Sequence, residues 1–254
     1  MRKFLARRLR FLRILLFRRF IYVQCETRIG VLFDRRTRLF SARWFFARIQ
    51  KPLKKVFNQS VDFIDNVHQS HINFKNVDVI ETSDRYYNGS IQYDSAGIPF
   101  AMNICRNASE KHITIFHEIG HLIDLVGVGT PGQFESRTAN GLFTRLLHLA
   151  QATPEIMKIN DMLASKVIQI GGNNLPLPAN TLNRLTYLID PAEIVARSYA
   201  QFIVEKSRSK KLVKMLQNRK KDNKFGEQWS ETNFRPLLLE WNNILNSIGW
   251  HVKR

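Results

Sequence analysis

The chain has 254 residues, 44% of them hydrophobic, and a formal net charge of +18. This length and apolar content suit one sizeable core with an appendage. With only two cysteines, Cys25 and Cys105, the chain can build neither a disulfide framework nor a zinc site made of cysteines.

Positive charge is concentrated in residues 1–55, where 17 Lys and Arg accompany two acids, Glu26 and Asp34, for a net charge of +15. The other 199 residues carry a net charge of only +3. We therefore expect a basic amphipathic helical arm over residues 1–55 and a globular domain over residues 56–254.

The arm opens with MRKFLARRLRFLRILLFRRF, whose arginines interrupt every apolar run before it reaches the roughly 20 residues that span a bilayer. We expect no transmembrane segment, and the apolar runs are also too short for a secretory signal. The arm could be a solvated helix that docks its Leu and Phe side chains on the domain. Alternatively it could dock on phosphate, in nucleic acid or at an anionic membrane surface, or serve as an organellar presequence. The candidate docking residues are Arg7, Arg8, Arg10, Arg13, Arg18 and Arg19.

The first elements of the domain follow from apolar periodicity. Residues 60–70 have helical spacing, and residues 76–82 alternate as a strand. Two further apolar runs predict a hairpin with strands near residues 91–93 and 98–104. Because Pro99 has no N–H to donate, we expect the second of these strands to lie at a sheet edge, where an extended peptide could add to it.

A helix is predicted within residues 107–129, NASEKHITIFHEIGHLIDLVGVG. Asn107 and Glu110 form a capping box at its start, with Ser109 as the alternative cap, and Gly127 marks its end. Its apolar residues cover nearly the whole circumference, so this helix should be buried on most sides. The later segments predict one or two helices in 141–170, a loop at 171–180, a helix at 190–207, an exposed basic loop or frayed helix end at 207–224, and an amphipathic closing helix at 233–250.

The helix carries a histidine pair with a glutamate between them. At about 100° per residue, His117 and His121 project from one stripe, which suits two ligands of one metal. Glu118 is rotated off that stripe, where it could act as general base on a metal-bound water. An isolated histidine in a helix is usually a satisfied core or surface residue. Three such groups in an otherwise apolar helix would be costly to bury without a cation, so we favour a metal site.

A zinc hydrolase needs a third protein ligand and an open position for water. His112 lies about 140° from the stripe and is disfavoured, and His148 lies in an apolar segment typical of core. Asp124, one turn beyond His121, could accept the free ring N–H of a ligand histidine, or could be a polar cap.

Glu193 is the strongest candidate for the third ligand. In DPAE, Asp190 and Pro191 start a helix, and Glu193 three residues after the cap could be explained by capping alone. However, Glu193 shares a face with Ala196 and Ala200, small residues that permit close helix packing, and a glutamate on such a face needs a partner.

These motifs resemble the gluzincin branch of the zincin metallopeptidases, and most closely the metallopeptidase-type domains associated with bacteriophage minor head and head-morphogenesis proteins. HEIGHLID, DPAEIVARSYAQFI and NSIGW occur in the order typical of that family, over residues 76–250. The resemblance implies an α+β zincin-like domain, with a small mixed sheet and an edge strand over the active-site helix, followed by a helical C-terminal part. It further implies Zn²⁺ held by His117, His121 and Glu193, with Glu118 as base.

The resemblance implies a zinc metallopeptidase that hydrolyses peptide bonds of a protein substrate, located in a virion or in host cytoplasm. A second donor to the reacting carbonyl oxygen would come from Tyr187, Tyr199 or Arg197, although Arg197 could simply pair with Glu193. The alternative is a zincin scaffold with little or no turnover, which acts as a structural, nucleic-acid-contacting component of a virion or other large particle through its basic arm.

Overall fold

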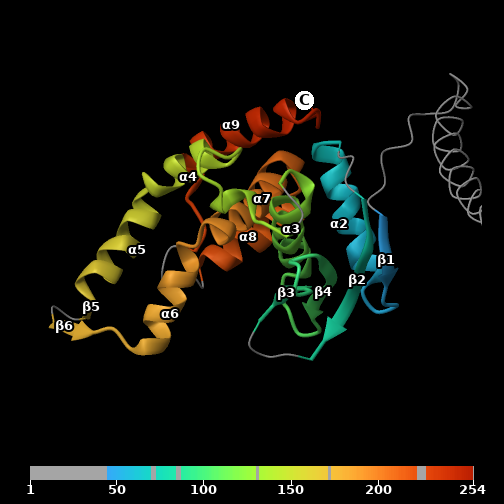
Figure 1. Cartoon of the computed structure of the whole chain (residues 1–254). Coiled ribbons are helices and arrows are strands. Elements are labelled where there is room, and N and C mark those ends of the chain that lie inside the picture. The colour runs from blue at the N-terminus through green and yellow to red at the C-terminus, as the bar shows by residue number, and fades with distance from the viewer. Residues whose placement is uncertain are drawn as a thin grey trace, which may run out of the picture. The chain divides into compact units, whose positions relative to one another are not determined.

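The computed structural model describes residues 45–69, 73–83, 87–129, 132–170, 173–221 and 227–253. The six arginines predicted to dock on phosphate lie outside these residues. The described elements, labelled as in Figure 1, are β1 (Phe45–Ile49), α2 (Lys54–Val67), β2 (Asn73–Thr82), β3 (Gly89–Tyr93), β4 (Pro99–Cys105), α3 (Lys111–Leu122), the π-helix η1 (Ile123–Gly127), the 3-10 helix η2 (Glu135–Arg137), α4 (Thr144–Gln151), α5 (Pro154–Ser165), β5 (Val167–Ile170), β6 (Asn173–Pro176), α6 (Ala179–Leu188), α7 (Pro191–Ser207), α8 (Lys210–Lys221) and α9 (Glu231–Ser247).

A four-stranded mixed sheet forms the N-terminal part of the described chain. Its order is β1-β2-β4-β3, with β1 and β4 parallel to β2 and β3 antiparallel to β4. The buried Val77 and Val79 of β2 belong to the main hydrophobic core. The sheet and the helices that follow it confirm the predicted α+β class, and the predicted strand and hairpin are both present.

The edge of this sheet is not where Pro99 suggested. β4 lies between β2 and β3, so β1 and β3 are the edge strands among the described residues, and the predicted edge strand at residues 98–104 is wrong. Pro99 is the first residue of β4, and pairing with β2 begins only at Ala101, opposite Asp78. The missing N–H therefore costs no ladder hydrogen bond on that side.

The sheet also includes residues that the sequence division assigned to the arm. β1 pairs in parallel with β2, and its Phe46 packs against Phe57 of α2, with ring centroids 4.9 Å apart. Residues from Phe45 onward thus belong to the folded domain, which begins ahead of the predicted boundary at residue 56.

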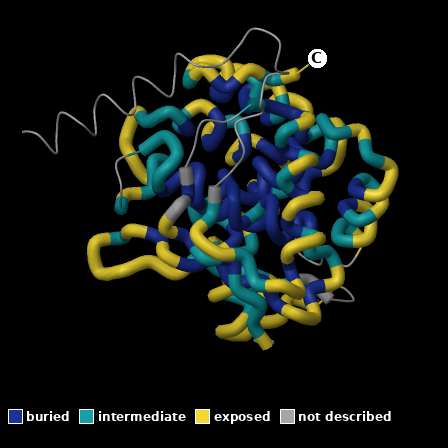
Figure 2. Tube along the Cα trace, turned by 90° about the vertical axis from the view of Figure 1, so that its right-hand side faces the viewer, coloured by how far each residue is buried: buried dark blue, intermediate teal, exposed yellow. Residues whose placement is uncertain are grey.

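Helix α3 is the central element, and it contacts α2, β3, β4, α7 and α8. All of its residues are buried except Lys111, His117 and His121, as its apolar circumference predicted. Buried residues gather in the interior of the described body (Figure 2). The predicted capping box is absent: Glu110 is the N-cap, no side chain caps the helix, and the Glu110 carboxylate pairs with Arg219 of α8.

The C-terminal half is mostly helical, and its helices α7 and α8 contact α3 while α5 and α6 extend away from it (Figure 1). Two predictions for this half are wrong. The basic stretch forms helix α8, because Leu212 and Leu216 recur at helical spacing and are buried. The stretch at 167–176 is a hairpin, β5 and β6, where a helix end and a loop were expected.

Two further observations complete the fold. The end of the chain returns to α2, where His68 and Val252 form an isolated antiparallel bridge. None of the helices in the described residues combines the length and the apolar character needed to cross a bilayer.

Candidate metal centre

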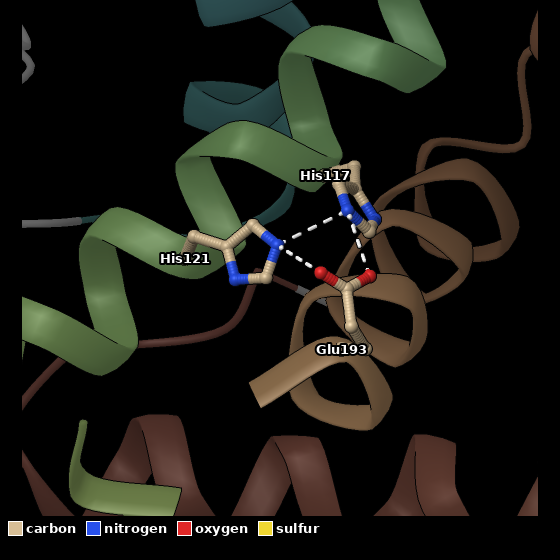
Figure 3. A group of neighbouring side chains, drawn as sticks. All are labelled: His117, His121 and Glu193. Carbon is tan, nitrogen blue, oxygen red and sulfur yellow. Dashed lines mark hydrogen bonds and ion pairs between the residues drawn. The ribbon is translucent and has the colours of Figure 1, made fainter. Parts of the chain in front are cut away.

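Helix α3 presents His117 and His121 on the same side, as their spacing of four residues predicts. Their Nε2 atoms lie 3.2 Å apart, and the two rings meet edge to face at 89°. The side chains are 14% and 13% exposed, so they sit at the bottom of a solvent-accessible depression. The two imidazoles thus converge on one point (Figure 3).

Glu193 reaches the same point from α7. The side chain of Asp190 caps this helix by accepting from the N–H of Ala192, and Pro191 occupies the first turn. Glu193 therefore need not serve as a cap, and its carboxylate turns toward α3. Its Oε1 lies 3.0 Å from His121 Nε2 and its Oε2 lies 3.3 Å from His117 Nε2 (Figure 3).

The two helices approach closely enough for this contact because small residues face each other at their crossing. A Cβ added to Gly120 would lie only 2.8 Å from the Cα of Ala196 and 3.3 Å from the Cβ of Tyr199. The predicted small face of α7 is thus the surface that packs on α3. The crossing sets the distance between the glutamate and the histidine pair.

The donor atoms of His117, His121 and Glu193 all lie within 4.8 Å of one another, so this group could hold a metal ion. Four ligands held tetrahedrally at about 2.0–2.1 Å from zinc are about 3.3 Å apart, which matches the 3.0–3.3 Å separations here. His121 Nδ1 and Glu193 Oε2 are buried and have no hydrogen-bond partner among the described residues. A cation between these donors would satisfy the carboxylate oxygen.

Burial and mutual interactions shift the pKa values of all three donors, and for His117 and Glu193 the shifts favour the forms that bind a cation. Burial lowers the pKa of His117 to about 4, although Glu193 opposes this, so the ring is neutral at pH 7. Burial alone would raise the pKa of Glu193, but the imidazoles of His117 and His121 hold it well below its usual range. Burial alone would lower the pKa of His121, and the hydrogen bond and charge of Glu193 outweigh it and raise that pKa.

Glu118 lies beside the three donors but is not one of them. It is 3% exposed, and burial raises its pKa to about 7, against the opposing charge of His121. Its carboxylate lies against Gly89 of the edge strand, where an added Cβ would be 2.5 Å from Glu118 Oε1. The absence of a side chain at position 89 therefore makes room for this carboxylate.

Two cavities adjoin the centre, and His117, Glu118, Tyr187 and Glu193 line both. The larger, about 510 Å³, is also lined by charged side chains of α6, α7 and α8. The smaller, about 350 Å³, is lined by the edge strand β3 and by apolar side chains that include Leu125 and Phe134. His117 and Glu193 thus border both cavities, and His121 borders the smaller one.

Of the three side chains proposed as carbonyl-oxygen donors, only Tyr187 is well placed. It lines both cavities, and its pKa is raised by burial and then by the charge of Glu193. Tyr199 is fully buried, and its hydroxyl donates to His68 Nε2 at 2.9 Å, so the prediction for Tyr199 is wrong. Its position on α7 faces the core, where it packs edge to face on Trp241.

Arg197 borders the larger cavity, but its guanidinium is used internally. It donates to the carbonyl of Glu227 at 2.6 Å and to that of Leu188 at the end of α6. It forms no ion pair with Glu193, and burial lowers its pKa to about 10. Arg197 therefore ties α6 and the segment before α9 to α7.

Asp124 does not make the predicted hydrogen bond with a ligand histidine. Its Oδ1 accepts from the Ser136 N–H at 2.7 Å and its Oδ2 from the Ser136 hydroxyl at 2.5 Å. The chain changes from α to π geometry at Ile123, so the angular spacing assumed for Asp124 does not hold. The carboxylate instead fixes the loop that carries Phe134 toward His121.

The two disfavoured histidines are absent from the centre. His112 contacts Ser60 and Lys211, and His148 is exposed on α4. Sequence reasoning missed Gly89 and Ser136. Gly89 was visible only as a turn residue, and nothing in the local sequence indicated Ser136.

Comparisons of the chain with protein-family models, curated proteins and solved structures give no match.

Proposed function

We propose that this protein is a zinc-dependent metallopeptidase that hydrolyses peptide bonds. The observation that carries the proposal is the convergence of His117, His121 and Glu193, with the separate carboxylate of Glu118 beside them. The zinc ion itself is part of the proposal. Two imidazoles and one carboxylate are a donor set typical of catalytic zinc.

Zinc in such a site lowers the pKa of bound water to about 7 and polarises a carbonyl group. Glu118 would take the proton of the attacking water and return it to the leaving amine, for which a pKa of about 7 is well suited. The hydroxyl of Tyr187 would donate to the carbonyl oxygen as negative charge develops on it. The outer edge of β3, which pairs with no other strand among the described residues, would hold the substrate extended along the smaller cavity.

The openness of the centre favours catalysis over a purely structural role. Structural zinc sites have four protein ligands, whereas catalytic sites keep a position for water. Among the described residues the centre has three candidate donors, and two cavities adjoin it. The resemblance of the motifs to phage head-associated domains leads us to propose a protein of a phage particle, or a host protein, as substrate.

Glu118→Gln tests the enzymatic part of the proposal. The variant should retain zinc and lose proteolysis by about 10²–10⁴-fold, because the amide cannot accept the proton. Cleavage would be measured on an unstructured fluorogenic protein and on the proteins of a phage particle, with Glu231→Gln, at an exposed glutamate of α9 that lines neither cavity, as control. If zinc is retained and cleavage by the variant equals that of the wild type, the centre is a scaffold and the enzymatic proposal fails.

A further inference from the structure

Helix α8 displays a stripe of polar side chains on its outer side. Its buried residues, Leu212 and Leu216, face the core. The opposite side carries residues spaced at i, i+4, i+7 and i+11, all of them exposed. This α8 stripe consists of Lys210, Lys214, Gln217 and Lys221.

The positive charge of this region is only partly compensated by acidic groups of the described residues. The segment 206–221 contains eight Lys and Arg and no acidic residue. Arg219 pairs with Glu110 of α3, and Lys211 Nζ contacts His112 Nε2. The three lysines of the α8 stripe form no ion pair within the described part of the chain.

Several of these charges stand where they destabilise an isolated helix. Lys210 and Lys214 are spaced at i,i+4, where two like charges repel each other and destabilise the helix. Lys210 and Lys211 lie in the first turn, where the helix macrodipole disfavours cations, and no acid is present there. Lys221 lies in the last turn, where the helix macrodipole favours a cation. Helix stability does not account for the lysines of the first turn. An external anion would offset their cost.

We propose that the α8 stripe binds the phosphodiester backbone of nucleic acid. The stripe extends over about 16 Å from Lys210 to Lys221, a length over which a duplex presents roughly nine phosphate charges. Three lysines could therefore each contact a phosphate. Gln217 and the adjacent exposed Asn218 can donate to phosphate or sugar oxygens.

The surface of α8 fits nucleic acid better than a lipid surface. A helix that binds a membrane surface needs a free apolar face, but Leu212 and Leu216 are buried in the core. None of the large exposed apolar side chains of the described residues lies on α8. The proposal concerns the folded domain and is independent of the metal centre.

The test compares two full-length triple variants with the same loss of charge. One is Lys210→Gln, Lys214→Gln and Lys221→Gln. The control replaces Lys54, Lys55 and Lys158 with Gln, since these lysines are also exposed and helical and form no ion pair among the described residues. Binding to short DNA and RNA duplexes would be measured over a range of salt concentrations, alongside vesicles of phosphatidylserine and phosphatidylcholine.

We expect the α8 variant to lower the slope of log affinity against log salt by about 2–3, roughly 0.9 for each lost phosphate contact. The control should change the slope much less, and Lys→Arg at the three α8 positions should preserve it. Equal slopes for the two Gln variants would overturn the proposal. So would loss of vesicle binding with duplex binding intact, which would indicate lipid as the partner.

Discussion

Four histidines in the interior of the described domain form two contrasting pairs. His68 and His112 have both ring nitrogens engaged by protein groups: His68 by the Gln69 carbonyl and the Tyr199 hydroxyl, and His112 by Ser60 and Lys211.

His117 and His121 instead direct Nε2 at each other and at a carboxylate, and His121 Nδ1 has no hydrogen-bond partner among the described residues. Burial lowers the pKa of His117 to about 4, as it does for His68 and His112, whereas at His121 the hydrogen bond and charge of Glu193 outweigh burial and raise the pKa. The two pairs therefore differ less in burial than in how their nitrogens are satisfied. Converging donors distinguish a metal centre from ordinary core histidines.

The largest effect expected outside the centre is the pH dependence caused by His68. Burial lowers its pKa from 6.5 to about 4, so between these values the unfolded chain binds a proton that the folded chain excludes. Stability is therefore lost as the pH falls through this window, by about 3 kcal/mol in total.

His68→Gln should be less stable at neutral pH, because its contacts with Tyr199 and Gln69 change, and should lose less stability on acidification. Urea unfolding between about pH 7 and pH 4.5 measures this, with the exposed His148→Gln as control. The remaining histidines titrate in all three proteins, so only the difference between them reports on His68. The same acid slope in His68→Gln and wild type would contradict the assignment of His68 as a neutral core residue.

Gly120→Ala tests whether the close crossing of α3 and α7 brings Glu193 to His117 and His121. This carboxylate is what distinguishes that pair of histidines from His68 and His112. Helix propensity alone would stabilise the variant by about 1 kcal/mol. The new Cβ would clash with the backbone of Ala196, and such overpacking costs about 1–3 kcal/mol.

We expect Gly120→Ala to show net destabilisation and weaker zinc binding, because Glu193 moves away from the histidines. The contacts of His112 with Ser60 and Lys211 should survive, because neither partner is among the nearest neighbours of the new Cβ. Thermal unfolding and zinc titration check both. A more stable variant with unchanged zinc affinity would show that the crossing does not set the geometry.

Gly89→Ala should have a smaller effect, confined to Glu118 and the adjacent Thr114, whose Cγ2 would lie 2.8 Å from the new Cβ. The new methyl group would displace the carboxylate of Glu118. None of the four histidines supplies one of the atoms nearest to that methyl group. We expect turnover to fall about tenfold, equivalent to about 1.4 kcal/mol, with zinc content and stability near those of the wild type. A variant with full activity would refute the view that the space at Gly89 positions the base.

The sequence predicted the centre well because its chemistry is mostly local. His117, Glu118 and His121 are fixed by one helical turn, and the α7 helix with its small face placed Glu193 correctly. Asp124 was misplaced because one π-helical turn changes the angular spacing. Tyr199 was misjudged because only tertiary packing reveals which face of α7 meets the core.

The errors in the sheet and around α8 also have physical causes. Strand order depends on long-range pairing, so Pro99 could indicate a missing donor but not which neighbour needed it. The charge of α8 obscured a helix held by only two buried leucines, Leu212 and Leu216. A short buried stripe is a weak signal among the six Lys and Arg of this helix.

Zinc content most directly tests the central claim that His117, His121 and Glu193 form a metal site. Purified wild type, dialysed against metal-free buffer, should retain one zinc ion per chain. His117→Ala and Glu193→Ala should each lose it, whereas His68→Gln and His112→Gln should keep it. No zinc in the wild type, or equal zinc in Glu193→Ala and His112→Gln, would contradict the account.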